Sequence, residues 1–295
     1  MEQLRVGNVV VASISEVEDC KVEISFLFND LSLEDMRRNS DWLDTNILDI
    51  ENHKLGFAFR AYAFKLGNET VLVDACNGNH KQRPTAPWQH NFDRPNFIEE
   101  LKSAGIAPQD VDYVICTHLH CDHVGWLTQL EDGDWTPTFH NALHVFSRIE
   151  FRFYEDRFLN EHSQAVNHGS FEDSVLPIIR SCRYTLAKND AVLIENTLGT
   201  VKLVPSPGHS IDHLCVSITS LNEEAIICGD AVHHPIQLDM PLIPMRADYD
   251  PELAVKSRLS LLSHCAETGA WLLAGHFSQY PFAQVKKYKD RFRIR

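Results

Sequence analysis

Short apolar runs separated by polar turns fill the first third of the chain, and this pattern predicts β-strands. Two of these runs flank the turn residues Gly-Asn-Glu and predict a hairpin. Apolar residues at helical spacing before Gly105 predict a helix over 96–106. The expected strands of this part are NVVVASI (8–14), KVEISFLF (21–28), FAFRAYAFKL (57–66), TVLVDA (70–75) and VDYVICTH (111–118).

The rest of the chain predicts two more groups of elements. The segment 146–187 is richer in charged and aromatic residues and is a candidate cover for a site, with helices expected over 147–159 and 172–181. A well-delimited helix is expected over 248–269, with Asp250 as its cap and Gly269 after its end. Strands are expected over 200–209, 214–219, 224–230 and 270–276, the last strand, before a solvated basic end at 286–295.

Several predicted strands stop at a residue that is able to bind a metal. TVLVDA reaches Asp74, the run before THLHCDH reaches residues 118–123, IICGD reaches Asp230 and WLLAGH reaches His276. A fifth run reaches His209 through a Pro-Gly turn. Because strand ends and their loops present chemistry while the strands are buried, we expect these loops to converge at one edge of the sheets.

Composition narrows the possible partners. Net charge is −14, with 27 basic against 41 acidic residues, so the chain is poorly suited to binding nucleic acid, which depends on Lys and Arg. It contains no run of about 18 apolar residues, which excludes a membrane span. The start lacks a convincing signal peptide, so we expect a cytoplasmic protein. The eight cysteines form no C-x-x-C pair, which favours reduced, buried thiols.

The loop His118-Leu-His120-Cys-Asp122-His123 carries the clearest chemical signal. Neutral imidazole and carboxylate are ligands of zinc and related metals. His118 and His120 alternate and so point the same way toward a first ion, while Asp122 and His123 follow after a turn and suit a second. So many polar groups would be costly to bury without a partner, which favours a metal site over a structural role.

This loop resembles the signature of the metallo-β-lactamase superfamily, and the later motifs SPGHS, CGDAVHH and AGHF match in order over about residues 57–280. The resemblance implies a single α/β domain over 1–295, a four-layer αββα sandwich of two packed αβ halves. It implies two divalent ions, zinc by first choice. Their implied ligands are His118, His120 and His209 for one ion, Asp122, His123 and His276 for the other, and Asp230 between them, with Asp74 supporting the site from outside.

Such a pair of ions implies a hydrolase that attacks its substrate with a bridging hydroxide, and Asp122 is a candidate for moving a proton to the leaving group. Asp230 stands where common zinc β-lactamases carry Cys or Ser. The loops are most similar to N-acyl-homoserine lactonases and to methyl parathion hydrolase. We therefore expect a small-molecule lactone or other carboxylic ester as substrate, with quorum quenching as the implied role. A homodimer remains open.

Alternatives remain at this point. One is an arylesterase or phosphotriesterase, because His233 replaces the Tyr that is usual in lactonases. His233 would either donate a hydrogen bond to the oxyanion or pack in the wall of the substrate pocket. Another is an oxidoreductase with a single iron, of the persulfide dioxygenase kind. We expect four aromatic residues to lie in the core and not in a substrate pocket: Trp126, Phe151, Phe153 and Tyr154. We expect structural roles for His213 and His234. The remaining histidines are expected to be ordinary: His140, His144, His162, His168 and His264.

Overall fold

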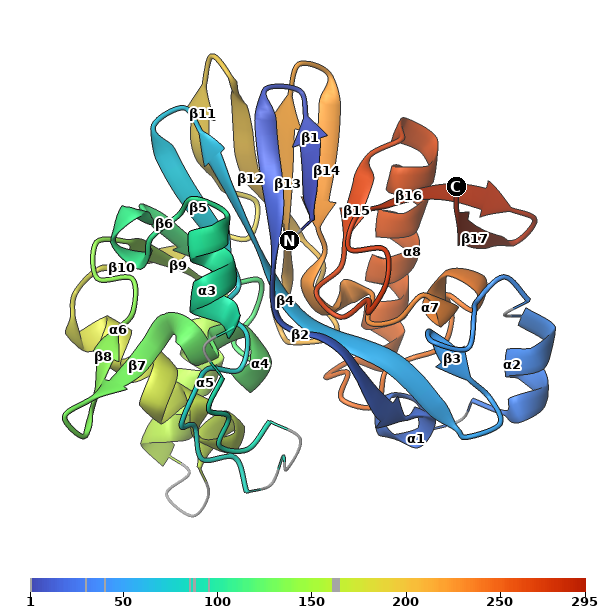
Figure 1. Cartoon of the computed structure of the whole chain (residues 1–295), viewed down its shortest axis with the longest axis horizontal. Coiled ribbons are helices and arrows are strands. Elements are labelled where there is room, and N and C mark those ends of the chain that lie inside the picture. Colours follow the sequence, from blue (N-terminus) through green and yellow to red (C-terminus); the bar gives the residue numbers. More distant parts are fainter. Residues whose placement is uncertain are drawn as a thin grey trace.

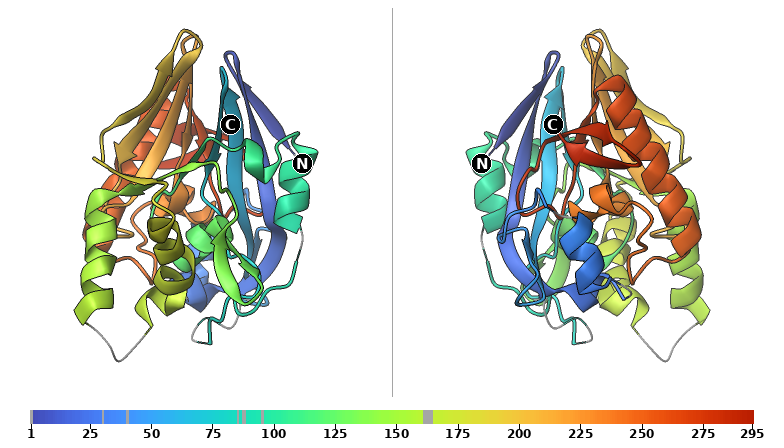
Figure 2. Two further views of the ribbon diagram at one scale, coloured as in Figure 1. Left: turned by 90° about the vertical axis from the view of Figure 1, so that its left-hand side faces the viewer. Right: turned by 90° about the vertical axis from the view of Figure 1, so that its right-hand side faces the viewer.

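The computed structural model describes residues 2–29, 31–39, 41–84, 86, 89–94, 96–160 and 165–295. His162 falls outside these residues, so the expectation for it is not addressed. Two β-sheets face each other, and helices cover their outer faces (Figures 1 and 2). The predicted αββα sandwich is therefore confirmed, whereas the single domain over 1–295 stays a prediction.

The first sheet comes from the N-terminal half, in the order β1-β2-β4-β5-β6-β9-β10, with β3 beside β4. The expected hairpin is confirmed, because β4 and β5 pair antiparallel around the turn. A separate two-stranded ribbon, β7-β8, was not anticipated from the sequence. The strands of this half are β1 (Gln3–Val6), β2 (Val9–Glu23), β3 (Leu48–Asp49), β4 (Lys54–Leu66), β5 (Glu69–Val73), β6 (Tyr113–Ile115), β7 (Thr128–Glu131), β8 (Asp134–Pro137), β9 (Leu143–Ser147) and β10 (Tyr184–Ala187).

The second sheet comes from the C-terminal half and follows the order of the chain from β11 to β17. Most neighbours are antiparallel, but β14 and β15 are parallel because α8 connects them. Its strands are β11 (Val192–Asn196), β12 (Gly199–Pro205), β13 (Leu214–Ser220), β14 (Glu223–Ile227), β15 (Trp271–Leu273), β16 (Ala283–Tyr288) and β17 (Arg291–Ile294).

Helices form the outer layers, and Figure 2 shows α3 and α8 on opposite outer faces. The predicted ends of α8 are confirmed, since Asp250 accepts from Leu253 N and Gly269 adopts a left-handed conformation. The helices are α1 (Ile24–Leu27), α2 (Leu33–Asn39), α3 (Asn96–Ser103), α4 (Cys121–Val124), α5 (Arg148–Asn160), α6 (Leu176–Arg180), α7 (Ile236–Asp239) and α8 (Pro251–Thr268), with 3-10 turns at Pro108–Asp110, Gly125–Leu127, Val166–Gly169 and Gly229–Ala231 and a π-helix at Phe171–Val175. None of the described helices combines the length and apolar character needed to cross a bilayer.

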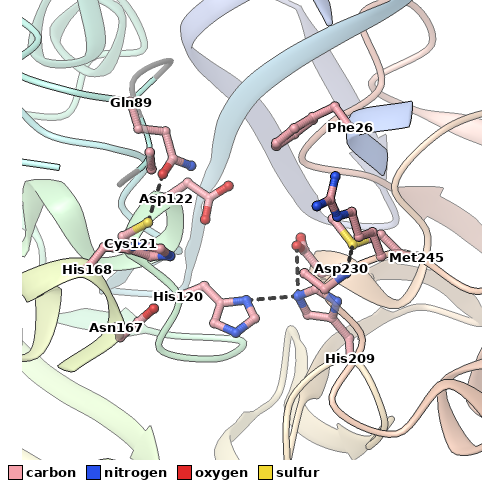
Figure 3. Close-up of a pocket in the computed structure, with 13 residues that line it drawn as sticks. Phe26, Gln89, His120, Cys121, Asp122, Asn167, His168, His209, Asp230 and Met245 are labelled. Carbon is pink, nitrogen blue, oxygen red and sulfur yellow. Dashed lines mark hydrogen bonds and ion pairs between the residues drawn. The ribbon is translucent and has the colours of Figure 1, made fainter. Parts of the chain in front are cut away.

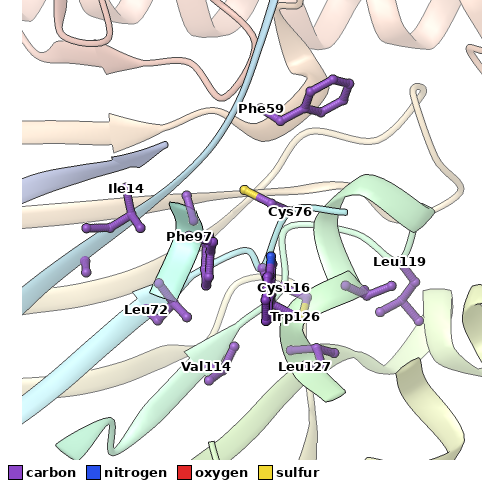
Figure 4. Packing of buried hydrophobic residues seen from close by; sticks show 14 of the residues in the cluster. Ile14, Phe59, Leu72, Cys76, Phe97, Val114, Cys116, Leu119, Trp126 and Leu127 are labelled. Atoms are coloured by element: carbon purple, nitrogen blue, oxygen red, sulfur yellow. The ribbon is translucent and has the colours of Figure 1, made fainter. Parts of the chain in front are cut away.

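Apolar side chains fill the space between the layers. One cluster lies between the sheets, with Tyr62 and Val73 from the first and Val216 and Leu273 from the second. Another packs the outer face of the first sheet against α3 and the loop after β6, where Phe97 and Trp126 stack at 5.6 Å between ring centres (Figure 4). Burial of this apolar surface is the main favourable contribution to the fold. Trp126, Phe151 and Tyr154 are buried in this cluster and Phe153 packs against it, so the core reading is confirmed.

Three sequence expectations at the edges of the fold are wrong. The run KVEISFLF does not stay extended, because the strand ends at Glu23 and α1 follows. The end of the chain is not a solvated tail, and 270–276 is not the last strand. Val285 and Phe292 are buried against the second sheet's outer cluster, which pins the hairpin β16-β17.

An irregularity in β2 matters for the site. The register with β4 shifts between Ser15 and Val17, and Glu16 turns into the interior with 1% exposure. Its carboxylate accepts hydrogen bonds from Asn77 N at 3.0 Å, Gly78 N at 3.0 Å and Trp126 Nε1 at 2.7 Å. Burial raises the pKa of Glu16 despite these donors. Glu16 thus joins the loop after β5 to the loop after α4.

Candidate metal centre

The loop after β6 presents its polar side chains on one side. His118 is 1% exposed and His120 comes directly before α4, which carries Asp122 and His123 in a single turn. Leu119 between the two histidines points into the core instead, and its N–H donates to Glu150 Oε1 at 3.0 Å. The alternation expected from the sequence is therefore present.

The C-terminal half supplies the other three residues from the ends of its strands. His209 follows β12, Asp230 lies in the turn after β14, and His276 follows β15. The turn at Asp230 depends on Gly229, where φ is +46° and a Cβ would lie 2.6 Å from His213 Nε2. Every loop that the sequence singled out therefore reaches this one place.

Asp230 lies between two groups of side chains. Its Oδ1 lies 3.0 Å from His123 Nε2 and 3.1 Å from His276 Nε2. Its Oδ2 lies 3.2 Å from His209 Nε2 and 3.8 Å from His118 Nε2. The two carboxylate oxygens thus face different sets of imidazoles, as a residue shared by two ions would.

The residues fit two metal ions. Potential ligand atoms of His118, His120, His209 and Asp230 lie within 4.8 Å of one another, and so do those of a second group. That second group consists of Asp122, His123 and His276. Buried atoms that face the centre, including Nε2 of His118 and of His123 and Oδ1 of Asp230, have no hydrogen-bond partner among the described residues. Unpaired buried groups are costly, and metal ions would satisfy them, so the cluster is consistent with a dinuclear site.

Hydrogen bonds behind the imidazoles fix which nitrogen faces the centre. His123 Nδ1 donates to Asp74 Oδ2 at 2.9 Å, and His276 Nδ1 donates to Ala58 O at 2.8 Å. His209 Nδ1 donates to Asp248 Oδ1 at 3.0 Å. Each bond leaves the Nε2 lone pair directed at the centre, the arrangement found behind metal-bound histidines.

Asp74 lies where the sequence predicted it, behind the cluster. It adopts a left-handed backbone with φ +63°, and its carboxylate accepts from Thr117 N at 2.8 Å as well as from His123. Asp248 was missed, because the sequence DYDP reads as the start of α8. No local pattern marks Asp248, since it meets His209 from 39 positions away.

The charge state of the cluster follows from burial and from its carboxylates. Burial lowers the pKa of His118 and of His120 well below the usual range, which keeps both rings neutral. Burial also opposes charge on His209, but Asp230 and Asp248 raise its pKa to about 9. Burial likewise works against ionised Asp230, yet His123 and His276 hold its pKa well below the usual range. Metal binding at such a site would release protons.

Three further histidines near Asp230 in the sequence or the fold, His213, His233 and His234, differ in placement. His233 is 1% exposed, and its Nε2 lies 3.1 Å from Asp230 Oδ2. His213 Nε2 accepts from Asp230 N at 2.9 Å, which agrees with the structural role expected for it. His234 points away and contacts Ile47 O at 3.0 Å, also as expected. A catalytic role for His233 stays a prediction.

A cavity of about 430 Å³ opens onto the cluster. Figure 3 shows Gln89, Cys121, Asp122, Asn167 and His168 on one side of it and Phe26, Met245 and Asp230 on the other. Asp122 reaches this space with a side chain that is 14% exposed, while its Oδ2 lies 3.7 Å from His276 Nε2. Cys121 donates to Gln89 Oε1 at 2.8 Å and does not belong to either group of potential ligands.

His168 is not the ordinary histidine that the sequence suggested, because it lines this cavity. Asn167 and His168 both have a left-handed backbone, with φ of 49° and 58°. Two such residues in succession are strained, and Asn167 Nδ2 holds the turn by donating to Leu119 O. Part of the segment 146–187 therefore does border the site.

Comparisons with known sequences agree with this geometry. A family model described as "Metallo-beta-lactamase superfamily" matches residues 60–276. An N-acyl homoserine lactonase of Bacillus thuringiensis is 24% identical over 183 residues, 61% of this chain and 61% of that protein. A probable metallo-hydrolase of Mycobacterium bovis is 25% identical over 162 residues, 50% of this chain and 47% of its own. A metallo-beta-lactamase domain-containing protein 1 of Xenopus laevis is 42% identical over 59 residues, 20% of each chain. These matches span less than two thirds of each relative.

Solved structures share the whole architecture. The dizinc quorum-quenching lactonase AidC superposes with a TM-score of 0.78 at 17% identity, covering 100% of this chain and 96% of its own. The hydrolase AbOPH superposes with a TM-score of 0.76 at 20% identity, covering 99% and 95%. At these identities the likeness shows the fold.

Proposed function

Since the chain belongs to the metallo-beta-lactamase superfamily, we propose that it is a metal-dependent hydrolase that cleaves a lactone or another carboxylic ester. The observation that carries this proposal is Asp230, whose two oxygens face two separate imidazole sets. We propose His118, His120 and His209 as ligands of one divalent ion, Asp122, His123 and His276 as ligands of the other, and Asp230 as the shared ligand. Imidazole-rich sites favour zinc.

Two divalent ions, when bound, supply a hydroxide at neutral pH and polarise the substrate carbonyl. The protein's own residues would then orient the ester and manage protons. Asp122 belongs to the ligand cluster and also lines the cavity, so it is placed to pass a proton to the leaving oxygen. A general acid or base must lie within hydrogen-bond reach of the proton that it transfers.

His233 has a different part in this proposal. Its Nε2 lies 3.1 Å from Asp230 Oδ2, a position that suits a residue that orients the carboxylate through electrostatic attraction. It does not belong to the cavity lining, which weakens the alternative of a donor to the oxyanion.

A small ester fits the cavity. A volume of about 430 Å³ lies in the range of small-molecule sites, roughly 300–1,000 Å³. The names of the lactonases among the similar proteins favour a lactone, and quorum quenching is the role that such a substrate would imply. An aryl ester or phosphotriester is the runner-up. The cytoplasmic location and the lack of nucleic-acid partners remain expectations from the sequence.

The test is metal analysis combined with a substrate panel. Protein reconstituted with zinc or manganese should hold about two ions per chain and should cleave acyl-homoserine lactones, simple lactones, aryl esters or a phosphotriester. A matched Asp122→Asn protein should keep its fold and lose most turnover. About one iron per chain, together with oxygen consumption on a persulfide, would replace this proposal with the oxidoreductase alternative. Metal-loaded protein that cleaves none of the panel would refute it.

A further inference from the structure

Arg246 lines the cavity and is the one Lys or Arg among the described residues that do so. Its backbone is fixed from both sides of the site. Arg246 N donates to the O atom of Leu27, the last residue of α1, at 2.8 Å, and Tyr249 N donates to His209 O at 3.0 Å. Asp248 in the same loop supports His209. The loop that carries Arg246 is therefore tied directly to the candidate metal centre.

Among the described residues, no carboxylate pairs with the guanidinium of Arg246. The guanidinium donates one long hydrogen bond, from Nη1 to Ser25 O at 3.5 Å. Two other arginines near the site are engaged differently: Arg83 pairs with Asp173 at 2.6 Å, and Arg258 donates to Ala231 O at 3.1 Å. Arg246 is exposed and lines the cavity, so its guanidinium is accessible to a bound ligand.

We propose that the substrate is an anionic ester, an ester or lactone whose remote end carries a carboxylate that pairs with Arg246. The planar guanidinium presents donors in a fork that matches a carboxylate. This inference rests on the proposed function, since two bound divalent ions would outweigh the negative charges of Asp122 and Asp230 and make the cavity favourable for an anion.

The lining of the cavity is consistent with a substrate that has an apolar linker and a polar reacting end. Phe26 and Met245 give an apolar surface to the cavity that Arg246 also lines, which suits a short hydrocarbon linker. Gln89, Asn167 and His168 give a polar surface across the cavity (Figure 3). Small-molecule sites commonly combine an apolar lining with a few placed polar groups that set orientation.

The test compares two esters that differ in charge alone. Monophenyl glutarate carries a free carboxylate, and phenyl 4-carbamoylbutanoate carries a neutral amide of the same size. Zinc-loaded wild type should show a kcat/KM about tenfold higher for the anionic ester, mainly through KM, as expected for one charge-assisted hydrogen-bonded pair. Arg246→Gln should bring the ratio close to one. Arg5→Gln is the matched control, since Arg5 is exposed on β1, far from α4 (Figure 1).

Each outcome decides the question. A wild-type ratio near one, or an Arg246→Gln protein that keeps the preference, overturns the anionic substrate while leaving the hydrolase proposal intact. If neither ester is cleaved, calorimetry with glutaric acid monoanilide still decides. About tenfold weaker binding to Arg246→Gln than to wild type and Arg5→Gln supports the carboxylate site, and equal or absent binding overturns it.

Discussion

Gly125 lies where the loop after α4 touches the loop after β5, and Gly125→Ala should damage the metal centre. The backbone at Gly125 is ordinary, with φ −58° and ψ −51°, so conformational strain does not require glycine here. The requirement is space: a Cβ at this position would lie 1.8 Å from Asn77 O and 2.5 Å from Gly78 N. These are backbone atoms that have no side-chain freedom to move aside.

The size of the effect follows from those distances. To reach an ordinary contact of 3.4 Å, the loops must separate by 3.4 − 1.8 = 1.6 Å. That movement would break the bonds from Gly125 N to Cys76 O at 2.8 Å and from Ala75 N to His123 O at 2.8 Å. Overpacking of about 1–3 kcal/mol, plus about 1 kcal/mol for each lost hydrogen bond, gives a loss of about 3–5 kcal/mol.

The assay has two readouts, urea unfolding and metal content after dialysis. We expect Gly125→Ala to fold with lower stability and to retain metal poorly, because the displaced loop carries Asp122 and His123. Gly133→Ala is the control, since nothing lies within 4 Å of its Cβ position and only its φ of +94° opposes the change. A Gly125→Ala protein with wild-type unfolding energy and full metal content would show that the reasoning from the close approach is wrong.

Three further predictions concern the residue that supports His209, the pH dependence of stability, and the effect of metal removal on stability. Asp248→Asn should weaken metal binding by about 10–100-fold, measured by competition with a chelator, because His209 loses its charged partner; Asp290→Asn should not. Burial lowers the pKa of His144 to about 4, so this ring takes up a proton more readily in the unfolded chain than in the folded one. The folded state therefore keeps its full stability above about pH 6.5 and loses stability as the pH falls toward 4. Urea unfolding should therefore lose about 2 kcal/mol more between pH 7 and pH 5 in wild type than in His144→Gln. Removal of metal by a chelator should lower the free energy of unfolding, and added zinc should restore it, because an ion stabilises the folded state that binds it. The gain is about 2.7 kcal/mol at a free ion concentration of 100 times Kd. An unfolding free energy that does not change on chelation would show that metal binding and folding are not coupled.

The proposed ligands were accessible from the sequence because each stands where an apolar run stops. His118 to His123 cluster locally, and His209, Asp230 and His276 follow strands whose ends meet at one edge of the sandwich. The supporting residues were not accessible in this way. Asp248 becomes visible only when its loop folds back onto His209, and Arg246 gains its place through the same loop.

Local irregularities hid other parts of the fold. Glu16 reads as one more polar residue in an alternating strand, and the register shift in β2 turns it inward to bind two loops. The basic composition of β16-β17 masked the alternation that buries Val285 and Phe292. A turn at Lys289, with φ of 57°, joins these two strands.

The division of the seven residues between the two halves has a consequence for biosynthesis. His118 and His276 are separated by 158 positions (276 − 118), and each group of potential ligands draws on both sheets. A nascent chain that has released only the 118–123 loop offers an incomplete set of donors for either ion. Capture of the first ion would then wait until His209 and Asp230 have been made and docked, and capture of the second until His276 after β15 has joined them, so a fully loaded centre would report that the late strands had joined the early ones.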